Sequence, residues 1–121
     1  MKGEDLEAAV TLTARILKKL RTEVVRRDSR LLVVFIQSQR EVEELDNSLP
    51  YQTQIADLCK KLGIEHFDLA PAFKNTWYRT YYRIGWHWNS RGHEVAAGAL
   101  YEYLNKYLTR SAKVVNPGAT Q

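Results

Sequence analysis

The chain has 121 residues, of which 18 are basic and 14 acidic, so its formal net charge is +4. A hydrophobic content of 45% is typical of a folded globular protein and argues against intrinsic disorder. The mild basic excess predicts no nucleic-acid partner, because such proteins usually gather a denser basic cluster. No apolar run approaches the roughly 20 residues that cross a bilayer, so we expect no membrane partner either.

The length predicts a single domain over residues 1–110, followed by a flexible tail over residues 111–121. The opening MKGEDLEAAV has no apolar signal-peptide core, and a single cysteine excludes a disulfide within the chain. If these residues are the whole gene product, we expect a cytoplasmic location; otherwise the location stays open.

The first predicted elements are a helix over residues 4–28 and a strand over residues 31–36. Leu6, Val10 and Leu17 belong to a set of apolar residues whose spacing keeps one helix face apolar. The strand LLVVFI is short, unbroken and rich in β-branched residues. A run that is apolar at every position indicates a strand covered on both faces, as in a parallel sheet.

A polar loop with one helical turn is predicted over residues 37–48, and a second helix follows. Asn47 or Ser48 could cap this helix, with Pro50 in its first turn and Gly63 ending it in a left-handed conformation. Cys59 lies on the apolar stripe of this helix, so we interpret it as a core thiol rather than a nucleophile.

Residues 64–69 are predicted to form a second strand, with His66 partly buried in it, and APAF to begin a loop. The last helix should start between Ser90 and Glu94, end near Leu108, and be capped by Asn89 and Ser90. Two strands joined by a helical crossover predict an α/β fold with a small parallel sheet, a right-handed βαβ unit and three main helices.

Four segments carry a resemblance to a known family: LLVVFI, ADLCKKLGI, FDLAPAF and HWNSRGHEVAAGALYEYL. In this order they resemble the C-terminal half of an SGNH (GDSL-type) hydrolase or acyltransferase. The family's Asn and Gly-His signature after its histidine is present as Asn89, Gly92 and His93. The resemblance covers residues 31–108 and implies a truncated flavodoxin-like fold with three α/β/α layers.

By this resemblance His87 occupies the position of the catalytic base, which takes a proton from a serine hydroxyl and returns it to the leaving group. The alternative is a histidine that only holds a loop in place. We interpret His93, which opens the last helix, as structural. No Asp, Glu or Cys near the two histidines completes a metal site, and we expect no metal or other cofactor.

The chain departs from the family in two ways. Ile84 stands three residues before His87, where the family usually has the aspartate that orients the base. Asp68, after the second strand, is the nearest carboxylate that could replace it, although turn capping is its simpler role. There is also no Gly-Asp-Ser nucleophile block and no oxyanion block, and Ser38 lacks the Gly-flanked turn that exposes a nucleophile.

The leading functional hypothesis is therefore the C-terminal portion of an esterase or acyltransferase, acting on an ester or sugar ester only in a complete protein and inactive alone. The alternative is a non-catalytic interaction module that uses an exposed sheet edge or the aromatic loop over residues 75–88. This loop contains Trp77, Tyr78, Tyr81, Tyr82, Trp86 and Trp88. The missing neighbour of the 31–36 strand predicts a homodimer through the open strand edge.

Overall fold

The computed structural model describes residues 3–43 and 50–115, which fall into two compact units. The first unit comprises Met1–Ile36 and Glu44–Asp68, and the second comprises Gln37–Glu43 and Leu69–Gln121. Each unit has buried hydrophobic residues of its own. The single domain expected over residues 1–110 stays a prediction.

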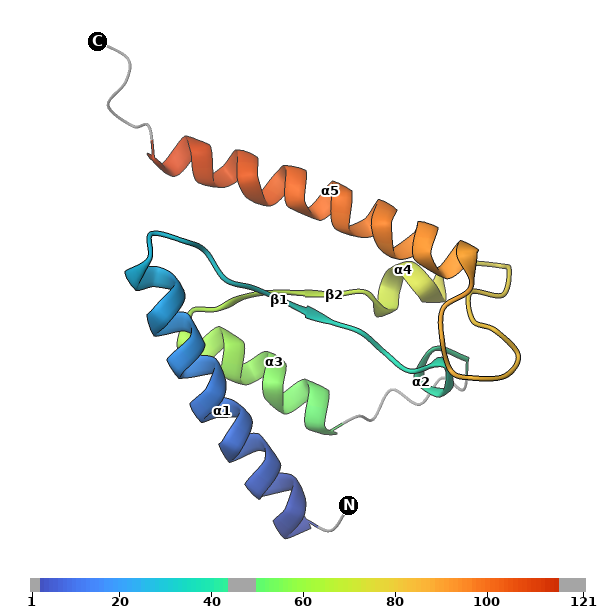
Figure 1. Ribbon diagram of the computed structural model, residues 1–121, viewed down its shortest axis with the longest axis horizontal. Helices are drawn as coiled ribbons and strands as arrows, with labels where there is room; N and C mark the ends of the chain where they lie inside the picture. Colours follow the sequence, from blue (N-terminus) through green and yellow to red (C-terminus); the bar gives the residue numbers. More distant parts are fainter. Residues whose placement is uncertain (1–2, 44–49, 116–121) are drawn as a thin grey trace. The chain divides into compact units, whose positions relative to one another are not determined.

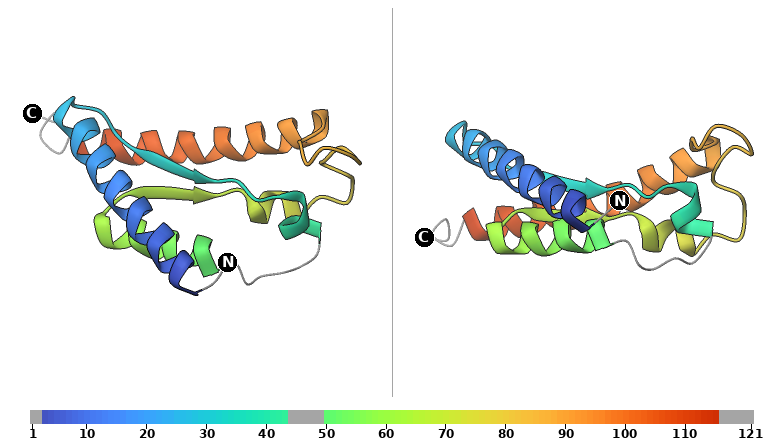
Figure 2. Two further views of the ribbon diagram at one scale, coloured as in Figure 1. Left: turned by 60° about the horizontal axis from the view of Figure 1, so that its bottom comes forward. Right: turned by 90° about the horizontal axis from the view of Figure 1, so that it is seen from below.

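The first unit is a βαβ arrangement preceded by a long helix (Figure 1). It contains α1 (Gly3–Arg26), β1 (Leu32–Phe35), α3 (Pro50–Leu62) and β2 (Glu65–Asp68). The two strands run parallel, and their register starts with Leu32 opposite Glu65. The views in Figure 2 show both strands pointing the same way. The predicted parallel pairing across a helical crossover is confirmed.

The core of this unit lies between the sheet and its two long helices. Ile55, Cys59 and Ile64 are buried, and hydrophobic residues of α1 and β1 pack against them. Val33 and Phe35 are the strand residues that face this cluster. Because side chains alternate along a strand, Leu32 and Val34 point to the opposite face of the sheet.

Gly63 ends α3 as the sequence predicts. Its φ of 63° lies in the left-handed region, where a side chain would be strained. The N–H of Gly63 bonds to the carbonyl of Lys60 at 3.2 Å, and the N–H of Ile64 to the carbonyl of Cys59 at 2.8 Å. These two bonds form a Schellman motif, which turns the chain directly into β2.

The second unit contains α2 (Gln39–Glu43), α4 (Ala70–Lys74) and α5 (Ser90–Val115). The short α2 matches the expected helical turn. The expectation of a loop at APAF is wrong, since these residues form α4, with a proline in its first turn. One helical turn is too short to show a helical period, so the sequence pattern could not reveal it.

Two further expectations concern helix ends. The helix α5 continues to Val115, past the end expected near Leu108 and into the expected tail, of which residues 116–121 lie outside the described residues. The expected caps Asn47 and Ser48 also lie outside them, although α3 does start at Pro50. Within residues 3–43 and 50–115, no helix combines the length and the apolar character that a membrane crossing requires.

Candidate functional site

His87 lies on a short hairpin that leads into α5, drawn in yellow and orange in Figure 1. This hairpin, residues 80–89, is closed by an antiparallel bridge between Tyr81 and Trp88. Inside the bridge, the N–H of Tyr82 donates to the carbonyl of His87 at 2.9 Å. The four residues between them form a tight tip, and the backbone around His87 is held at both sides.

Asn89 connects the base of the hairpin to the start of α5. Its Nδ2 donates to the carbonyl of Arg79 at 2.9 Å, and its backbone N–H donates to the carbonyl of Thr80 at 3.0 Å. Its Oδ1 accepts from the N–H of Gly92 at 2.9 Å, which is the bond of a helix N-cap. The predicted cap is confirmed as Asn89, and the same side chain also ties the hairpin together.

Gly92 allows the hairpin and α5 to meet. A Cβ at this position would lie 2.2 Å from the carbonyl oxygen of Thr80 and 2.9 Å from Cβ of Trp88. The first distance is far below any real contact. A glycine is therefore required here by the close approach of two backbones, and this position in the motif has a structural role.

An aromatic cluster packs the two arms of the hairpin against α4. The ring of Phe73, on α4, stacks on Trp88 at a centroid distance of 5.3 Å and lies 5.9 Å from that of Tyr81. The Tyr81 hydroxyl is buried and donates to the carbonyl of Gln37 at 3.0 Å. His93 is exposed, with its ring edge-on to Trp88 at 5.5 Å. These contacts agree with a structural interpretation of His93.

The His87 side chain itself is exposed. Its imidazole forms no hydrogen bond or ion pair with another described residue. Ile84, in the family's aspartate position, is 91% exposed and cannot orient a base. The site therefore presents an accessible imidazole, without a described group that would fix its tautomer.

The other candidate residues do not complete a catalytic set. Ser38 caps α2: its Oγ accepts from the N–H of Glu41 at 3.4 Å, and its own N–H donates to the Glu41 carboxylate, which is a capping box. Asp68 is an exposed residue at the end of β2. It belongs to the first unit and His87 to the second, so its nomination as a replacement carboxylate stays a prediction.

Cys59 and His66 belong to the body of the first unit. The thiol of Cys59 is fully buried, and this desolvation raises its pKa, which keeps it neutral and unreactive. The expected core thiol is confirmed. His66 is half-buried on β2, with its ring edge-on to that of Phe35 at 5.9 Å.

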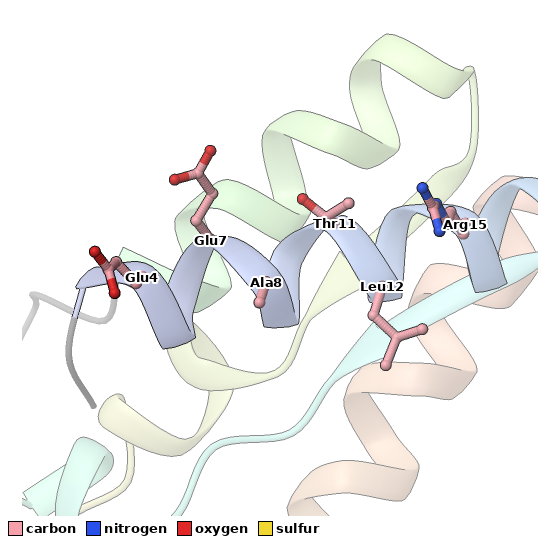
Figure 3. A pocket seen from close by; sticks show the side chains of 6 residues that line it. All are labelled: Glu4, Glu7, Ala8, Thr11, Leu12 and Arg15. Carbon is pink, nitrogen blue, oxygen red and sulfur yellow. The ribbon is translucent and has the colours of Figure 1, made fainter.

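Three hollows, on α1, on α5 and around residues 59–66, are not lined by His87. Figure 3 shows one of about 410 Å³ on α1, and all of its lining side chains come from that single helix: Glu4, Glu7, Ala8, Thr11, Leu12 and Arg15. A groove on one face of one helix does not converge on a ligand. Among the described residues, no group of three or more His, Cys, Asp or Glu side chains gathers at a metal-binding distance.

The aromatic residues of the loop over residues 75–88 divide into buried and exposed ones, and the sequence did not reveal which are which. Tyr81 is buried, whereas Trp77 is 90% and Trp86 65% exposed. Gly85 and Trp86 both have positive φ, of 106° and 63°, and form the turn of the tip. The only local signal for this turn was Gly85, because composition cannot tell which aromatic residue faces inward.

Comparison with known proteins adds no relative: no family model, no curated protein and no solved structure matches the chain.

Proposed function

We propose that the chain is the C-terminal portion of an SGNH-type esterase or acyltransferase, with a truncated flavodoxin-like three-layer α/β/α fold, in which His87 is the general base. The observation that carries this proposal is the placement of His87. It is exposed on a hairpin held by Asn89 and Gly92, directly before α5. A base that must reach a substrate needs this combination of access and a fixed backbone.

In the proposed reaction, the His87 imidazole takes the proton of a serine hydroxyl as its oxygen attacks an ester carbonyl. The tetrahedral intermediate then releases the alcohol, which receives the proton from the imidazolium and leaves an acyl-serine. Water or a second alcohol accepts the acyl group, and family analogy points to a sugar ester as the substrate. The family's nucleophile and oxyanion blocks have no counterpart in these 121 residues, so another segment must supply them.

The 121 residues alone should show no appreciable turnover of short-chain aryl esters, because they provide a base without a nucleophile or oxyanion donors. The measurement is hydrolysis by the purified chain, with His87→Ala as the comparison. Robust turnover that disappears in His87→Ala would contradict this prediction and would require a serine within the chain.

The catalytic proposal itself is tested on the genomic sequence upstream. A Gly-Asp-Ser block in the same frame supports it, and the joined protein should lose ester turnover in His87→Ala. His93→Ala is the matched control, since His93 is also exposed but lies on α5, outside the hairpin. Equal loss in both variants, or full activity of His87→Ala, would rule out His87 as the base.

A second candidate function is a non-catalytic interaction module. It is favoured by the exposed aromatic side chains of the hairpin region and by the two-stranded sheet. Within the described part of the chain, β1 pairs only with β2, so its outer edge offers backbone groups to another strand. Leu12, Ile16 and Leu20 also leave an apolar stripe exposed on α1.

We therefore expect a homodimer through the outer edge of β1 at micromolar concentration. Sedimentation velocity should show a dimer that dissociates on dilution, and amide exchange over Leu32–Phe35 should slow as the dimer forms. A monomer that unfolds cooperatively at the same concentration would contradict this expectation.

A further inference from the structure

The tip of the hairpin presents apolar side chains directly to solvent. Ile84 is 91% and Trp86 65% exposed, and both lie in the four-residue turn that begins at Arg83. Single exposed hydrophobic residues are ordinary, but two at the end of a projecting turn, with Trp77 also 90% exposed nearby in sequence, form a recognisable interaction feature.

The hairpin is built so that these side chains stay outside. At its base Thr80 is 4% and Tyr81 2% exposed, and the Asn89 bonds close the two arms. Trp86 adopts a positive φ, which is unfavourable for a residue with a Cβ. The fold therefore accepts local strain and two solvent-exposed apolar groups at this turn.

The stretch of sequence that contains the tip carries charge of one sign. From Leu69 to His93 the chain has no Asp or Glu, and its four cations are Lys74, Arg79, Arg83 and Arg91. The whole excess of 18 basic over 14 acidic residues therefore lies in this segment. All four side chains are exposed, and Arg91 lies over the ring of Tyr78 at 4.9 Å. Such a surface suits an anionic partner.

The aliphatic side chain of Ile84 indicates which kind of anionic partner fits the tip. A single-stranded nucleic acid is held by aromatic rings that stack on its bases; Trp86 has such a ring, but Ile84, the more exposed of the two, has no face for stacking. A bilayer accepts all three side-chain types: an aliphatic group in its hydrocarbon, tryptophan at the interface, and arginine at the phosphates.

We propose that the hairpin tip, residues 83–86, is a peripheral anchor that inserts Ile84 and Trp86 into an anionic lipid surface, while Arg79 and Arg83 contact the headgroups. This differs from the expectation of no membrane partner, which considered spanning segments. It rests on the interaction function proposed above and is independent of the catalytic one.

The test is co-sedimentation of the full chain with vesicles of phosphatidylcholine and phosphatidylserine, compared with phosphatidylcholine alone. We expect binding to the anionic vesicles only, weakened by 0.5 M salt because the contacts are partly electrostatic. The double variant Ile84→Ser/Trp86→Asn should bind at least about tenfold more weakly, since burying one such side chain is worth a factor of ten or more. Asparagine at position 86 tolerates the positive φ.

Tyr101→Ser, on α5, is the matched control, because Tyr101 is 69% exposed but lies outside the hairpin. It should bind as the unaltered chain does, and circular dichroism should show all variants folded. The proposal is overturned if the unaltered chain does not bind anionic vesicles, or if the double variant binds them as well as the unaltered chain does. It is also overturned if Trp86 is instead needed to bind a single-stranded oligonucleotide, which would leave the interaction function standing with another partner.

Discussion

Gly92→Ala should destabilise the second unit by at least about 1–3 kcal/mol, the usual cost of overpacking. The new Cβ would lie 2.2 Å from the carbonyl oxygen of Thr80, which is backbone and cannot rotate away. Relief would require the hairpin to move from α5, breaking the bond from Gly92 to Asn89. The measurement is urea unfolding followed by circular dichroism, with the slope m compared between variants.

Gly98→Ala provides the matched control on the same helix. A Cβ at Gly98 meets nothing within 4 Å, and the residue is exposed. Alanine should therefore stabilise α5 by about 0.5–1 kcal/mol through its higher helix propensity. If the two alanine variants shift the midpoint in the same direction, the close approach of α5 to Thr80 is not a feature of the folded protein.

Phe73→Ala should cost about 3–5 kcal/mol, as is usual for a buried aromatic residue. Phe73 is 3% exposed and stacks on Trp88 while also contacting Tyr81, so its removal leaves a cavity beneath both arms of the hairpin. Thermal or urea unfolding measures the loss, and near-ultraviolet circular dichroism should report the loosened aromatic cluster.

Trp77→Ala is the control for Phe73. It removes a larger ring from the same region, but Trp77 is 90% exposed, so the change in stability should stay within about ±0.5 kcal/mol. A stability loss that follows ring size rather than burial would show that the aromatic loop packs differently from the described arrangement.

The elements that could be predicted from the sequence are those with a long or a chemically distinct pattern. The apolar stripe of α1, the unbroken run of β1 and the left-handed Gly63 each depend on local preferences that the chain context preserved. α4 could not be found because five residues show no period, and the far end of α5 was missed because its composition is that of a frayed tail.

The candidate site was predictable only where its features depend on neighbouring residues in the sequence. The cap at Asn89 is a local signal, since a short polar side chain before a helix satisfies nearby N–H groups. The requirement for glycine at position 92 comes from Thr80, twelve residues earlier, and has no local signature. Tyr81 is buried because it packs against Phe73 of α4, whereas Trp86 stays exposed. The sequence did not predict α4, so this difference could not be foreseen.

The division of the chain between its two units has a consequence for synthesis on the ribosome. Residues 37–43 are made within the first unit but belong to the second, where the Gln37 carbonyl receives its bond from Tyr81, 44 residues later. At about 5–20 residues per second, the Tyr81 hydroxyl is made roughly 2–9 s after Gln37. The first unit is complete in sequence at Asp68, so its sheet can form before the Tyr81 hydroxyl that bonds to the Gln37 carbonyl has been made.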